Sequence, residues 1–351
     1  MERLTFVYII YKIIGKNMKD DDKITFYQAV GSEERKCMKV LVTGVAGQLG
    51  HDVMNELYRC GYEGIGTDLR ETYQGIEDGT PVTCAPYYSL DITNLEEVMG
   101  VIEMVHPDAV IHCAAWTAVD AAEEEENLER VTAVNVVGTR NLAKVCAGMD
   151  CRMMYISTDY VFDGQGEIPW EPDCTEYAPL NVYGKTKLEG ELVVKELVEK
   201  FFIVRIAWVF GKNGNNFIRT MLKLGKKHDH LSVVNDQIGT PTYTLDLARL
   251  LVEMIASEQY GYYHATNEGG YISWYEFACE IFKQAAAMGY EEYDENHLTV
   301  AAVSTEEYGI SKAKRPFNSR LSKKKLEEHG FPLLPTWQDA LARYLNEIAP
   351  F

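Results

Sequence analysis

The segment "LNVYGKTKLEG", residues 180–190, places Tyr183 four residues before Lys187 in a stretch that is typical of a helix start. On a helix, side chains at this spacing lie on one face and can point into the same cleft. A phenol with an ordinary pKa of about 10 can ionise near neutral pH when a nearby ammonium, or an oxidised nicotinamide, stabilises its anion. Such a pair could donate a proton to a carbonyl oxygen as hydride arrives at its carbon. The same spacing also occurs by chance, as a packed tyrosine beside an exposed lysine.

A hydroxyl that hydrogen-bonds the same carbonyl oxygen is expected from the end of a neighbouring parallel strand. The strand pattern "RMMYISTDY", residues 152–160, offers Ser157 and Thr158. Because side chains alternate along a strand, we expect only one of these two hydroxyls to face the cleft. The strand pattern alone does not choose between them.

Three glycines follow the first apolar strand at a spacing that suits a dinucleotide. The segment "VTGVAGQLG", residues 42–50, has Gly44, Gly47 and Gly50 between that strand and a helix. Glycine permits a tight turn and lets the backbone approach a diphosphate, whose charge meets the unpaired N–H groups at the helix start. We therefore predict a dinucleotide site rather than a purely structural turn. The inner face of the helix is expected to hold Leu49, Val53 and Leu57.

The second strand pattern, "EGIGTD", ends at Asp68, 24 residues after Gly44. A carboxylate at this place would accept hydrogen bonds from the adenosine ribose and repel a 2′-phosphate, which favours NAD over NADP. Arg70 could offset that repulsion. The alternative interpretation of Asp68 is an acidic cap at the end of a strand.

Short β-rich runs alternate with helical patterns from Met38 onward, including a long helix through residues 131–148 and one strand through residues 201–211. The alternation predicts an α/β fold, a Rossmann-type doubly wound parallel sheet. Thr93 and Glu96 have the spacing of a capping box. We expect residues 38–210 to form the NAD(P)-binding domain.

The alternation loosens after about Gly211, where turn-rich pieces separate the predicted helices. Residues 211–351 are expected to form mainly a smaller, substrate-binding C-terminal lobe that is interleaved with the first domain. Residues 1–37 precede the strand pattern and are left as an unassigned extension. The helices of the second lobe are predicted at 216–227, 244–256, 273–287 and 337–348.

A formal net charge of −19 over 351 residues opposes nucleic-acid or anionic-membrane binding, although a small anionic ligand could still bind locally. The eight cysteines include no CxxC pair, and no His or carboxylate cluster points to a metal. We therefore expect reduced thiols and a cytoplasmic protein. The apolar start "LTFVYIIYKIIG" is too short to span a bilayer and is broken by Lys12.

The segment 311–325, "SKAKRPFNSRLSKKK", contains seven Lys or Arg residues and no acid. Arg matches the geometry of phosphate oxygens, so we assign Arg315 and Arg320 to the nucleotide diphosphate or its surroundings. The alternative is a solvated basic face.

The glycine turn, the Asp after the second strand, the Ser/Thr pair and Y-x-x-x-K together resemble the extended short-chain dehydrogenase/reductase superfamily, from Met38 to the C-terminus. Five further segments, in order along the chain, resemble the dTDP-4-dehydrorhamnose reductase family. They are "STDYVFDG", "PLNVYGKTKLEGE", "NNF", "VVNDQIGTPT" and "RPFNSRL".

The resemblance implies a catalytic hydroxyl on Thr158, a proton donor in Tyr183, and a lysine, Lys187, that lowers the phenol pKa and holds the nicotinamide ribose. The expected reaction is reduction of the C4 ketone of dTDP-4-dehydro-L-rhamnose to dTDP-L-rhamnose by NADPH or NADH. Sugar contacts are implied for Thr158, Asp159 and Trp208, with Asp159 expected in an exposed loop and Trp208 open to a core role. Cofactor contacts are implied, beside Tyr183 and Lys187, for Gly44, Gly47, Gln48, Leu49, Gly50, Asp68, Leu69, Asp91, Ile92, Ala115, Trp116 and Thr117.

Three alternatives remain open at this point. Nucleotide-sugar dehydratases share these motifs but carry Thr-Asp-Glu, whereas Tyr160 stands here in place of the glutamate. A reductase of another nucleotide 4-keto-6-deoxy sugar would look much alike. A non-catalytic NAD(P)-binding subunit resembling the β subunit of methionine adenosyltransferase would keep the fold. The segment 70–89 is longer than expected for the family, and the sequence leaves a Mg²⁺ requirement and a homodimer open.

Overall fold

The computed structural model describes residues 37–309 and 311–351. The chain divides into Met1–Cys37 and Met38–Phe351, and the second unit carries the fold described below. The predicted extension, residues 1–37, lies outside the described residues except for Cys37.

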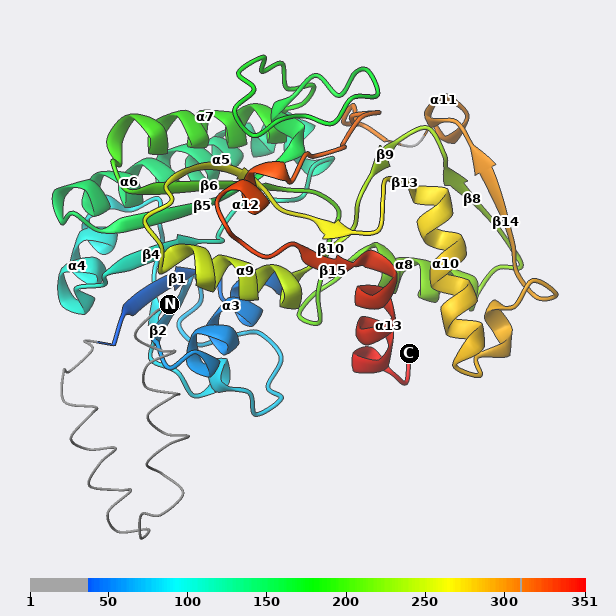
Figure 1. Ribbon diagram of the computed structural model, residues 1–351, viewed down its shortest axis with the longest axis horizontal. Coiled ribbons are helices and arrows are strands. Elements are labelled where there is room, and N and C mark those ends of the chain that lie inside the picture. The colour runs from blue at the N-terminus through cyan, green and yellow to red at the C-terminus, as the bar shows by residue number, and fades with distance from the viewer. Residues whose placement is uncertain (1–36, 310) are drawn as a thin grey trace, which may run out of the picture. The chain divides into compact units, whose positions relative to one another are not determined.

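Seven parallel strands form the central sheet, in the order β11-β6-β5-β4-β1-β2-β3 (Figure 1). This is the doubly wound strand order extended by one strand, and it confirms the predicted α/β fold. The winding direction reverses between β1 and β4, where the carboxyl ends of the strands leave room for a ligand. The strands are β1 (Lys39–Thr43), β2 (Glu63–Asp68), β3 (Tyr87–Ser89), β4 (Ala109–His112), β5 (Arg152–Thr158), β6 (Phe201–Ile206) and β11 (Gly261–His264).

Helices cover both faces of the sheet because its strands carry apolar side chains on both sides. Val40 and Val42 belong to the core shared with α3 and α9, whereas Leu41 between them belongs to the core shared with α4, α6 and α7. The predicted long helix is interrupted by a π-helical segment between α5 and α6. The bounds are α3 (Gln48–Arg59), α4 (Leu95–Val105), α5 (Leu128–Thr132), the π-helical segment (Ala133–Gly138), α6 (Thr139–Gly148), α7 (Val182–Leu197) and α9 (Thr244–Ile255).

The second lobe packs three helices and a parallel strand pair around a core of its own, on the right of Figure 1. The predicted helices of this half of the chain all exist, with bounds that differ by at most two residues from the expected ones. The larger elements are α8 (Phe217–Gly225), α10 (Trp274–Ala287), α13 (Trp337–Ile348), β8 (His230–Val234) and β14 (Thr299–Val303).

The two halves of the sequence are interleaved in space. Strand β11 and helix α9 follow residue 211, yet β11 pairs with β6 and α9 packs on α3. A division of function at residue 210 therefore stays a prediction. The remaining elements are short: β7 (Val209–Phe210), β9 (Ile238–Gly239), β10 (Thr242–Tyr243), β12 (Asn267–Glu268), β13 (Ile272–Ser273), β15 (Leu334–Thr336), α11 (Thr305–Tyr308) and α12 (Lys324–Glu328).

The predicted capping box at Thr93 is wrong. The N-cap of α4 is Asn94, whose side-chain oxygen accepts hydrogen bonds from the backbone N–H groups of Glu96 and Glu97. The Thr93 hydroxyl instead donates to Asp91 at 2.7 Å. Asparagine is a strong N-cap residue, so the shift by one residue follows from the competition between two neighbouring caps.

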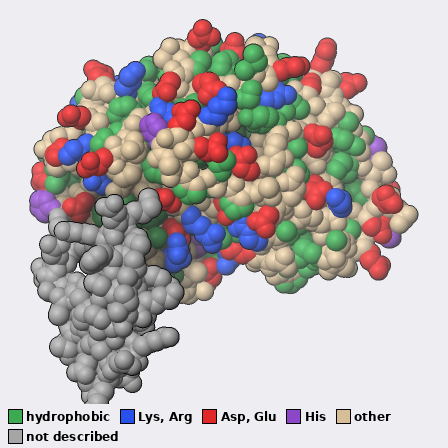
Figure 2. Space-filling view, viewed as in Figure 1, with side chains coloured by type: hydrophobic (Ala, Val, Ile, Leu, Met, Phe, Trp, Pro, Cys, Tyr) green, Lys and Arg blue, Asp and Glu red, His purple; other side chains and the backbone are tan. Residues whose placement is uncertain are grey.

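Acidic and basic side chains are interspersed over the surface seen in Figure 2. The cysteines from Cys60 to Cys279 form no disulfide bonds. No helix among residues 37–309 and 311–351 is long and apolar enough to cross a membrane.

Candidate active site

A cavity of about 760 Å³ lies at the carboxyl ends of β1, β2, β4, β5 and β6. It brings together residues from both halves of the chain, as the parallel sheet requires. Among the residues predicted from sequence, those that line it are Gly44, Gly47, Gln48, Leu49, Gly50, Asp68, Leu69, Asp91, Ile92, Ala115, Thr117, Thr158, Asp159, Tyr183, Lys187 and Trp208.

The glycine turn between β1 and α3 leaves space that a side chain would fill. Gly44 has φ of +72°, and a Cβ at this position would lie 2.7 Å from the backbone nitrogen of Ala114. A Cβ on Gly50 would lie 2.3 Å from the carbonyl oxygen of Gly44. Helix α3 then starts at Gln48 without a side-chain cap, so its first N–H groups are available to an anion. The turn therefore fits a diphosphate.

Asp68 has a structural role at the end of β2 and also lines the cavity. Its Oδ2 accepts a hydrogen bond from the backbone N–H of Ala46 at 3.0 Å, and its Oδ1 accepts one from Leu69 at 2.8 Å. The carboxylate thus anchors the glycine turn to the end of β2. It also lines the cavity, where its remaining acceptor capacity can meet ribose hydroxyls.

Trp116 does not line the cavity, although its neighbours Ala115 and Thr117 do. Its backbone N–H donates to Asn135 at 2.8 Å, and its indole N–H donates to the carbonyl oxygen of Ala118. Its ring lies under the guanidinium of Arg130. A side-chain contact between Trp116 and a cofactor is therefore not supported.

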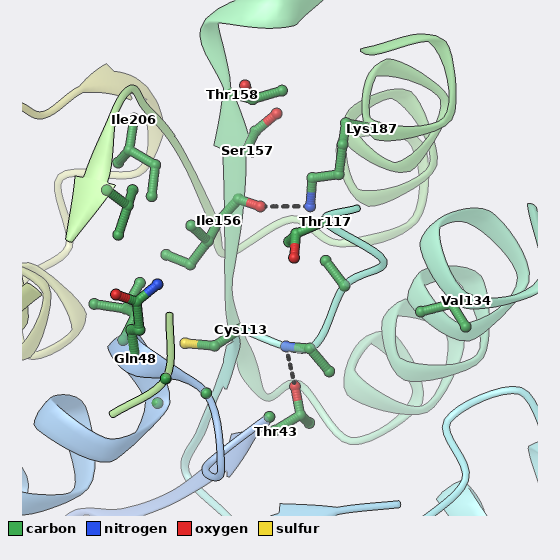
Figure 3. A pocket seen from close by; sticks show the side chains of 18 of the residues that line it. Thr43, Gln48, Cys113, Thr117, Val134, Ile156, Ser157, Thr158, Lys187 and Ile206 are labelled. Carbon is green, nitrogen blue, oxygen red and sulfur yellow. Dashed lines mark hydrogen bonds between the residues drawn. The ribbon is translucent and has the colours of Figure 1, made fainter. Parts of the chain in front are cut away.

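Helix α7 presents Tyr183 and Lys187 to the cavity. The Asn181 side chain caps the helix by accepting a hydrogen bond from Gly184 N–H at 2.8 Å, so the first turn begins at Val182. Lys187 is buried rather than exposed, and its Nζ donates to the carbonyl oxygen of Ile156 at 2.7 Å (Figure 3). The pair is therefore not the packed tyrosine and exposed lysine that the spacing alone allowed.

Burial opposes charge on both members of this pair. It raises the pKa of Tyr183, and the Asp159 carboxylate raises it further, while a hydrogen bond with Thr158 acts in the opposite direction. It lowers the pKa of Lys187 to about 7, against the opposing effect of Glu191. A positive charge brought into the cavity would favour the phenolate, because opposite charges nearby stabilise the ionised form.

Ser157 and Thr158 both line the cavity but have different partners. The Ser157 hydroxyl donates to Oε1 of the buried Glu191 at 2.5 Å. The Thr158 hydroxyl donates to Asp159 at 3.0 Å and accepts from Tyr160 N–H at 3.2 Å. Thr158 is thus the hydroxyl that lies near Tyr183. The hydroxyl of Ser157 is instead occupied by its hydrogen bond to Glu191.

Asp159 is buried, so its expected place in an exposed loop is wrong. It begins a short 3₁₀ turn directly after β5. Burial raises its pKa to about 6, in spite of hydrogen bonds from Ser319 and Thr158. Its Oδ2 has no hydrogen-bond partner within the described residues. A buried polar atom facing a cavity is a ready acceptor for a ligand hydroxyl.

Trp208 interrupts the strand predicted at 201–211. Its φ of +51° is rare for a bulky residue and separates β6 from β7. Its ring stacks on Trp274, with centroids 3.7 Å apart and planes at 15°, and both rings line the cavity. Trp208 therefore forms part of the cavity wall and also packs against a small hydrophobic cluster. The sequence analysis missed Trp274, whose position at the first turn of α10 carries no local signal.

A loop from the second half of the chain closes over the glycine turn. Gln48 Oε1 accepts hydrogen bonds from Gly211 N–H at 2.8 Å and from the Asn216 amide at 3.0 Å. The Asn213 amide donates to the carbonyl oxygen of Ala46 at 2.9 Å. Gln48 thus joins the two halves of the chain as well as lining the cavity. The sequence analysis also missed Asn213, Gly214 and Asn215 as lining residues.

The unusually long segment 70–89 supports the same loop. Asp78 pairs with Lys212 at 2.8 Å, and Ile76 N–H donates to Asn213. Tyr73 donates to or accepts from His51 on α3 at 2.7 Å. The extra length is therefore packed against α3 and the loop.

The basic run at 311–325 is engaged in ion pairs. Arg315 pairs with Asp120 at 2.7 Å, and Lys325 pairs with Asp173 at 2.6 Å. Arg320 donates to Asn318, and neither Arg315 nor Arg320 lines the cavity. The predicted contact of Arg315 and Arg320 with a diphosphate is not supported, because neither residue lines the cavity. Within the described ranges, no cluster of His, Cys, Asp or Glu is arranged to hold a metal ion.

The doubly wound sheet, the glycine turn and the Thr158, Tyr183 and Lys187 group define a short-chain dehydrogenase/reductase of the extended type. Residues 38–349 match the RmlD substrate binding domain family. The chain belongs to this family, that of the dTDP-4-dehydrorhamnose reductases.

Three relatives illustrate the match. The dTDP-4-dehydrorhamnose reductase of Aggregatibacter actinomycetemcomitans is 39% identical in an alignment 312 residues long that covers 86% of this chain and 97% of that protein. The crystal structure of dTDP-4-dehydrorhamnose reductase from Bacillus anthracis in complex with NADP is 38% identical, with a TM-score of 0.76, over 89% of this chain and 99% of that chain. The dTDP-4-keto-6-deoxy-D-glucose reductase of Streptomyces niveus is 36% identical over 70% of this chain and 78% of that protein.

Proposed function

We propose that this chain reduces the C4 ketone of dTDP-4-dehydro-L-rhamnose to dTDP-L-rhamnose with NADPH or NADH. The observation that carries the proposal is the gathering of Thr158, Tyr183 and Lys187 in the cavity that also contains the glycine turn. The family membership and the reductases named among its relatives support it. Residues 38–210 would mainly hold the cofactor, and residues 211–351 would mainly complete the sugar site.

The chain's own residues have separate roles in this reaction. When bound, the reduced nicotinamide supplies hydride to C4 of the sugar. Tyr183 donates its phenolic proton to the carbonyl oxygen, and Thr158 donates a hydrogen bond to the same oxygen. Lys187 favours the phenolate that remains and holds the nicotinamide ribose. Trp208 and Asp159 would contact the sugar, Asp159 through its unpartnered oxygen.

Reduction fits the site better than dehydration. Tyr160 occupies the position at which the dehydratases carry a glutamate, and its side chain packs edge-on against Tyr183. Elimination of water would lack its proton acceptor. A purely regulatory role is also less well supported, because the three reactive side chains are intact and share one cavity.

A reductase of a related sugar is the second candidate. The Streptomyces niveus relative is named for reduction of a 4-keto-6-deoxy-D-glucose nucleotide, so the family includes more than one named substrate. The cofactor preference follows from opposing residues: Asp68 disfavours a 2′-phosphate, and Arg70 offers it a partner. We propose that both NADH and NADPH are accepted. A cytoplasmic location, suggested by the free thiols, and a homodimer stay predictions.

The test is a reduction assay with the full-length chain. We expect the absorbance of NADPH or NADH to fall when dTDP-4-dehydro-L-rhamnose is added, and to stay constant when the sugar is omitted. A panel of 4-keto nucleotide sugars, compared by kcat/KM, identifies the preferred substrate. Measurable cofactor binding without any consumption across the panel would sink the reductase proposal and favour the regulatory alternative.

A further inference from the structure

A buried ion pair lies one helical turn beyond the reactive lysine. Glu191 is on α7, four residues after Lys187, and Arg205 is on β6; both side chains are fully buried. Glu191 accepts two hydrogen bonds from Arg205, at 2.8 Å from Nε and 2.7 Å from Nη2. This bidentate geometry fixes the carboxylate, because the guanidinium and the carboxylate match in two bonds at once.

Three consecutive residues of β5 each lie beside a different side chain of α7, namely Lys187, Glu191 or Tyr183. The carbonyl oxygen of Ile156 accepts from Lys187, and Ser157 donates to Glu191 at 2.5 Å. Thr158 lies close enough to Tyr183 to lower the pKa of its phenol. Figure 3 shows Ile156, Ser157 and Thr158 succeeding one another along the strand beside Lys187. The carboxylate is therefore tied to the same strand and helix that carry the reactive groups.

The other titratable groups that face Lys187 are neutral near pH 7. Burial lowers the pKa of His112 on β4 to about 3 and raises that of Cys113 to about 12. Burial also raises the pKa of Tyr155 on β5, whose ring lies 4.0 Å from Nζ, and that of Tyr183. Burial lowers the pKa of Lys187, and the Glu191 carboxylate is the charge that opposes this effect.

We propose that Glu191 is a positioning residue for the ketone reduction: held by Arg205 and Ser157, its carboxylate favours the protonated form of the buried Lys187 amine. The charge on Lys187 in turn favours the phenolate of Tyr183. The expected effect of Glu191 on turnover rests on the proposed function, whereas its expected effect on the protonation of Lys187 does not. Stability alone gives little reason for such a pair, because well-packed apolar residues often replace buried ion pairs without loss.

The direct test is the titration of Lys187 in the full-length chain. ¹³Cε-labelled lysine gives an NMR signal that reports protonation, and the Lys187 signal is identified by its absence in Lys187→Met. We expect the midpoint to fall by about one pH unit or more in Glu191→Gln, because a nearby opposite charge favours the charged form by this amount. Glu196→Gln, on the exposed side of the same helix, is the matched control and should leave the midpoint unchanged.

A second variant separates the electrostatic role from folding. Glu191→Gln leaves Arg205 buried without its anion and can destabilise the chain. The double variant Glu191→Gln/Arg205→Met removes both charges together, and we expect a smaller downward shift of the Lys187 midpoint, because loss of the Arg205 charge offsets part of the loss of the carboxylate. Glu191→Asp keeps a carboxylate and should restore most of the wild-type value.

The kinetic readout follows from the same reasoning. In either variant without the carboxylate, the alkaline limb of the kcat profile should move to lower pH by about the shift of the Lys187 midpoint, with KM for NADPH little changed near pH 6. A Lys187 midpoint equal to that of the wild type in every folded variant that lacks the carboxylate overturns the proposal, whether or not the enzyme turns over any sugar. A shifted midpoint without turnover on any sugar would instead count against the proposed function.

Discussion

Two walls of the cavity differ in the atoms that they present to a ligand. The glycine turn presents backbone atoms, whereas the ends of β5 and α7 present side chains. At the first wall the backbone itself lines the cavity. Gly44 and Gly50 leave no room for a Cβ, and α3 begins without a side-chain cap on its first N–H groups. At the second wall buried side chains face the cavity, among them Asp159 and Lys187, with shifted pKa values. Substitutions at the first wall should therefore act through steric fit, and those at the second through charge and proton transfer.

The largest effect is expected from the proton donor of the second wall. Tyr183→Phe should lower kcat by about 100-fold or more, because the hydroxyl acts in the transition state. Cofactor affinity, measured by fluorescence titration with NADPH, should change little. Tyr58→Phe, on an exposed face of α3, is the control. Near-normal turnover in Tyr183→Phe would remove this residue from its proposed role.

At the first wall, Gly50→Ala should weaken cofactor binding by about 10- to 100-fold, because inserted volume in a close-packed site typically costs about 1–3 kcal/mol. The added Cβ would meet backbone atoms of Gly44 and Val45, which cannot rotate away. Dissociation constants for NADPH and NADH give the measurement. Gly100→Ala in α4, where a Cβ meets nothing within 4 Å, should bind normally and be slightly more stable. Equal affinities for the two variants would contradict the steric account of this wall.

Asp159 offers a test of charge at the second wall through stability. Its folded-state pKa of about 6 lies above the ordinary 3.8, so the folded chain holds the proton more tightly than the unfolded chain. The destabilisation from Asp159 is therefore small below pH 4, grows as pH rises towards 6, and persists above it.

Asp159→Asn should accordingly gain about 2 kcal/mol of stability at pH 8 relative to its effect at pH 4, since one pKa unit corresponds to about 1.4 kcal/mol. Denaturant titrations at both pH values measure the difference. Asp229→Asn, at an exposed turn, should show no such pH dependence. The same gain at both pH values would mean that the ionised carboxylate carries no burial penalty.

The smallest effect is expected where the two halves of the chain are joined beside the first wall. The Asp78–Lys212 pair is partly exposed, so Lys212→Met should lower stability by about 0.5–1 kcal/mol and leave kcat near its wild-type value. Thermal unfolding and steady-state kinetics test this. Lys223→Met, on the exposed side of α8, is the control. A large loss of NADPH affinity in Lys212→Met would show that the loop, rather than the glycine turn alone, holds the cofactor.

Much of the fold and of the reactive group could be predicted from local patterns. Alternating strands and helices predicted the parallel sheet, and the glycine spacing predicted the turn that follows β1. The four-residue spacing predicted the shared face of Tyr183 and Lys187, because helix geometry is local. Competition between neighbouring residues made short-range details less certain, as the cap at Asn94 illustrates.

Other features depend on residues distant in the sequence. Trp208 stacks on Trp274, and the hydrogen bond from Gly211 to Gln48 joins residues separated by 163 positions. Part of the basic run is paired with distant acids such as Asp120, which no local pattern pairs with it. Burial raises the pKa of Asp159, and a hydrogen bond from Ser319, a residue distant in the sequence, opposes this effect.

The sequence by itself determined which chemical groups are present and the local geometry that orients them: the glycine turn, the helix cap at Asn181 and the Tyr183–Lys187 face. The tertiary structure alone decided which of these groups are removed from water and what lies beside them. That division has a physical reason. Backbone geometry and side-chain spacing are set within a few residues, whereas desolvation and the charges that shift a pKa come from every segment that packs around the site.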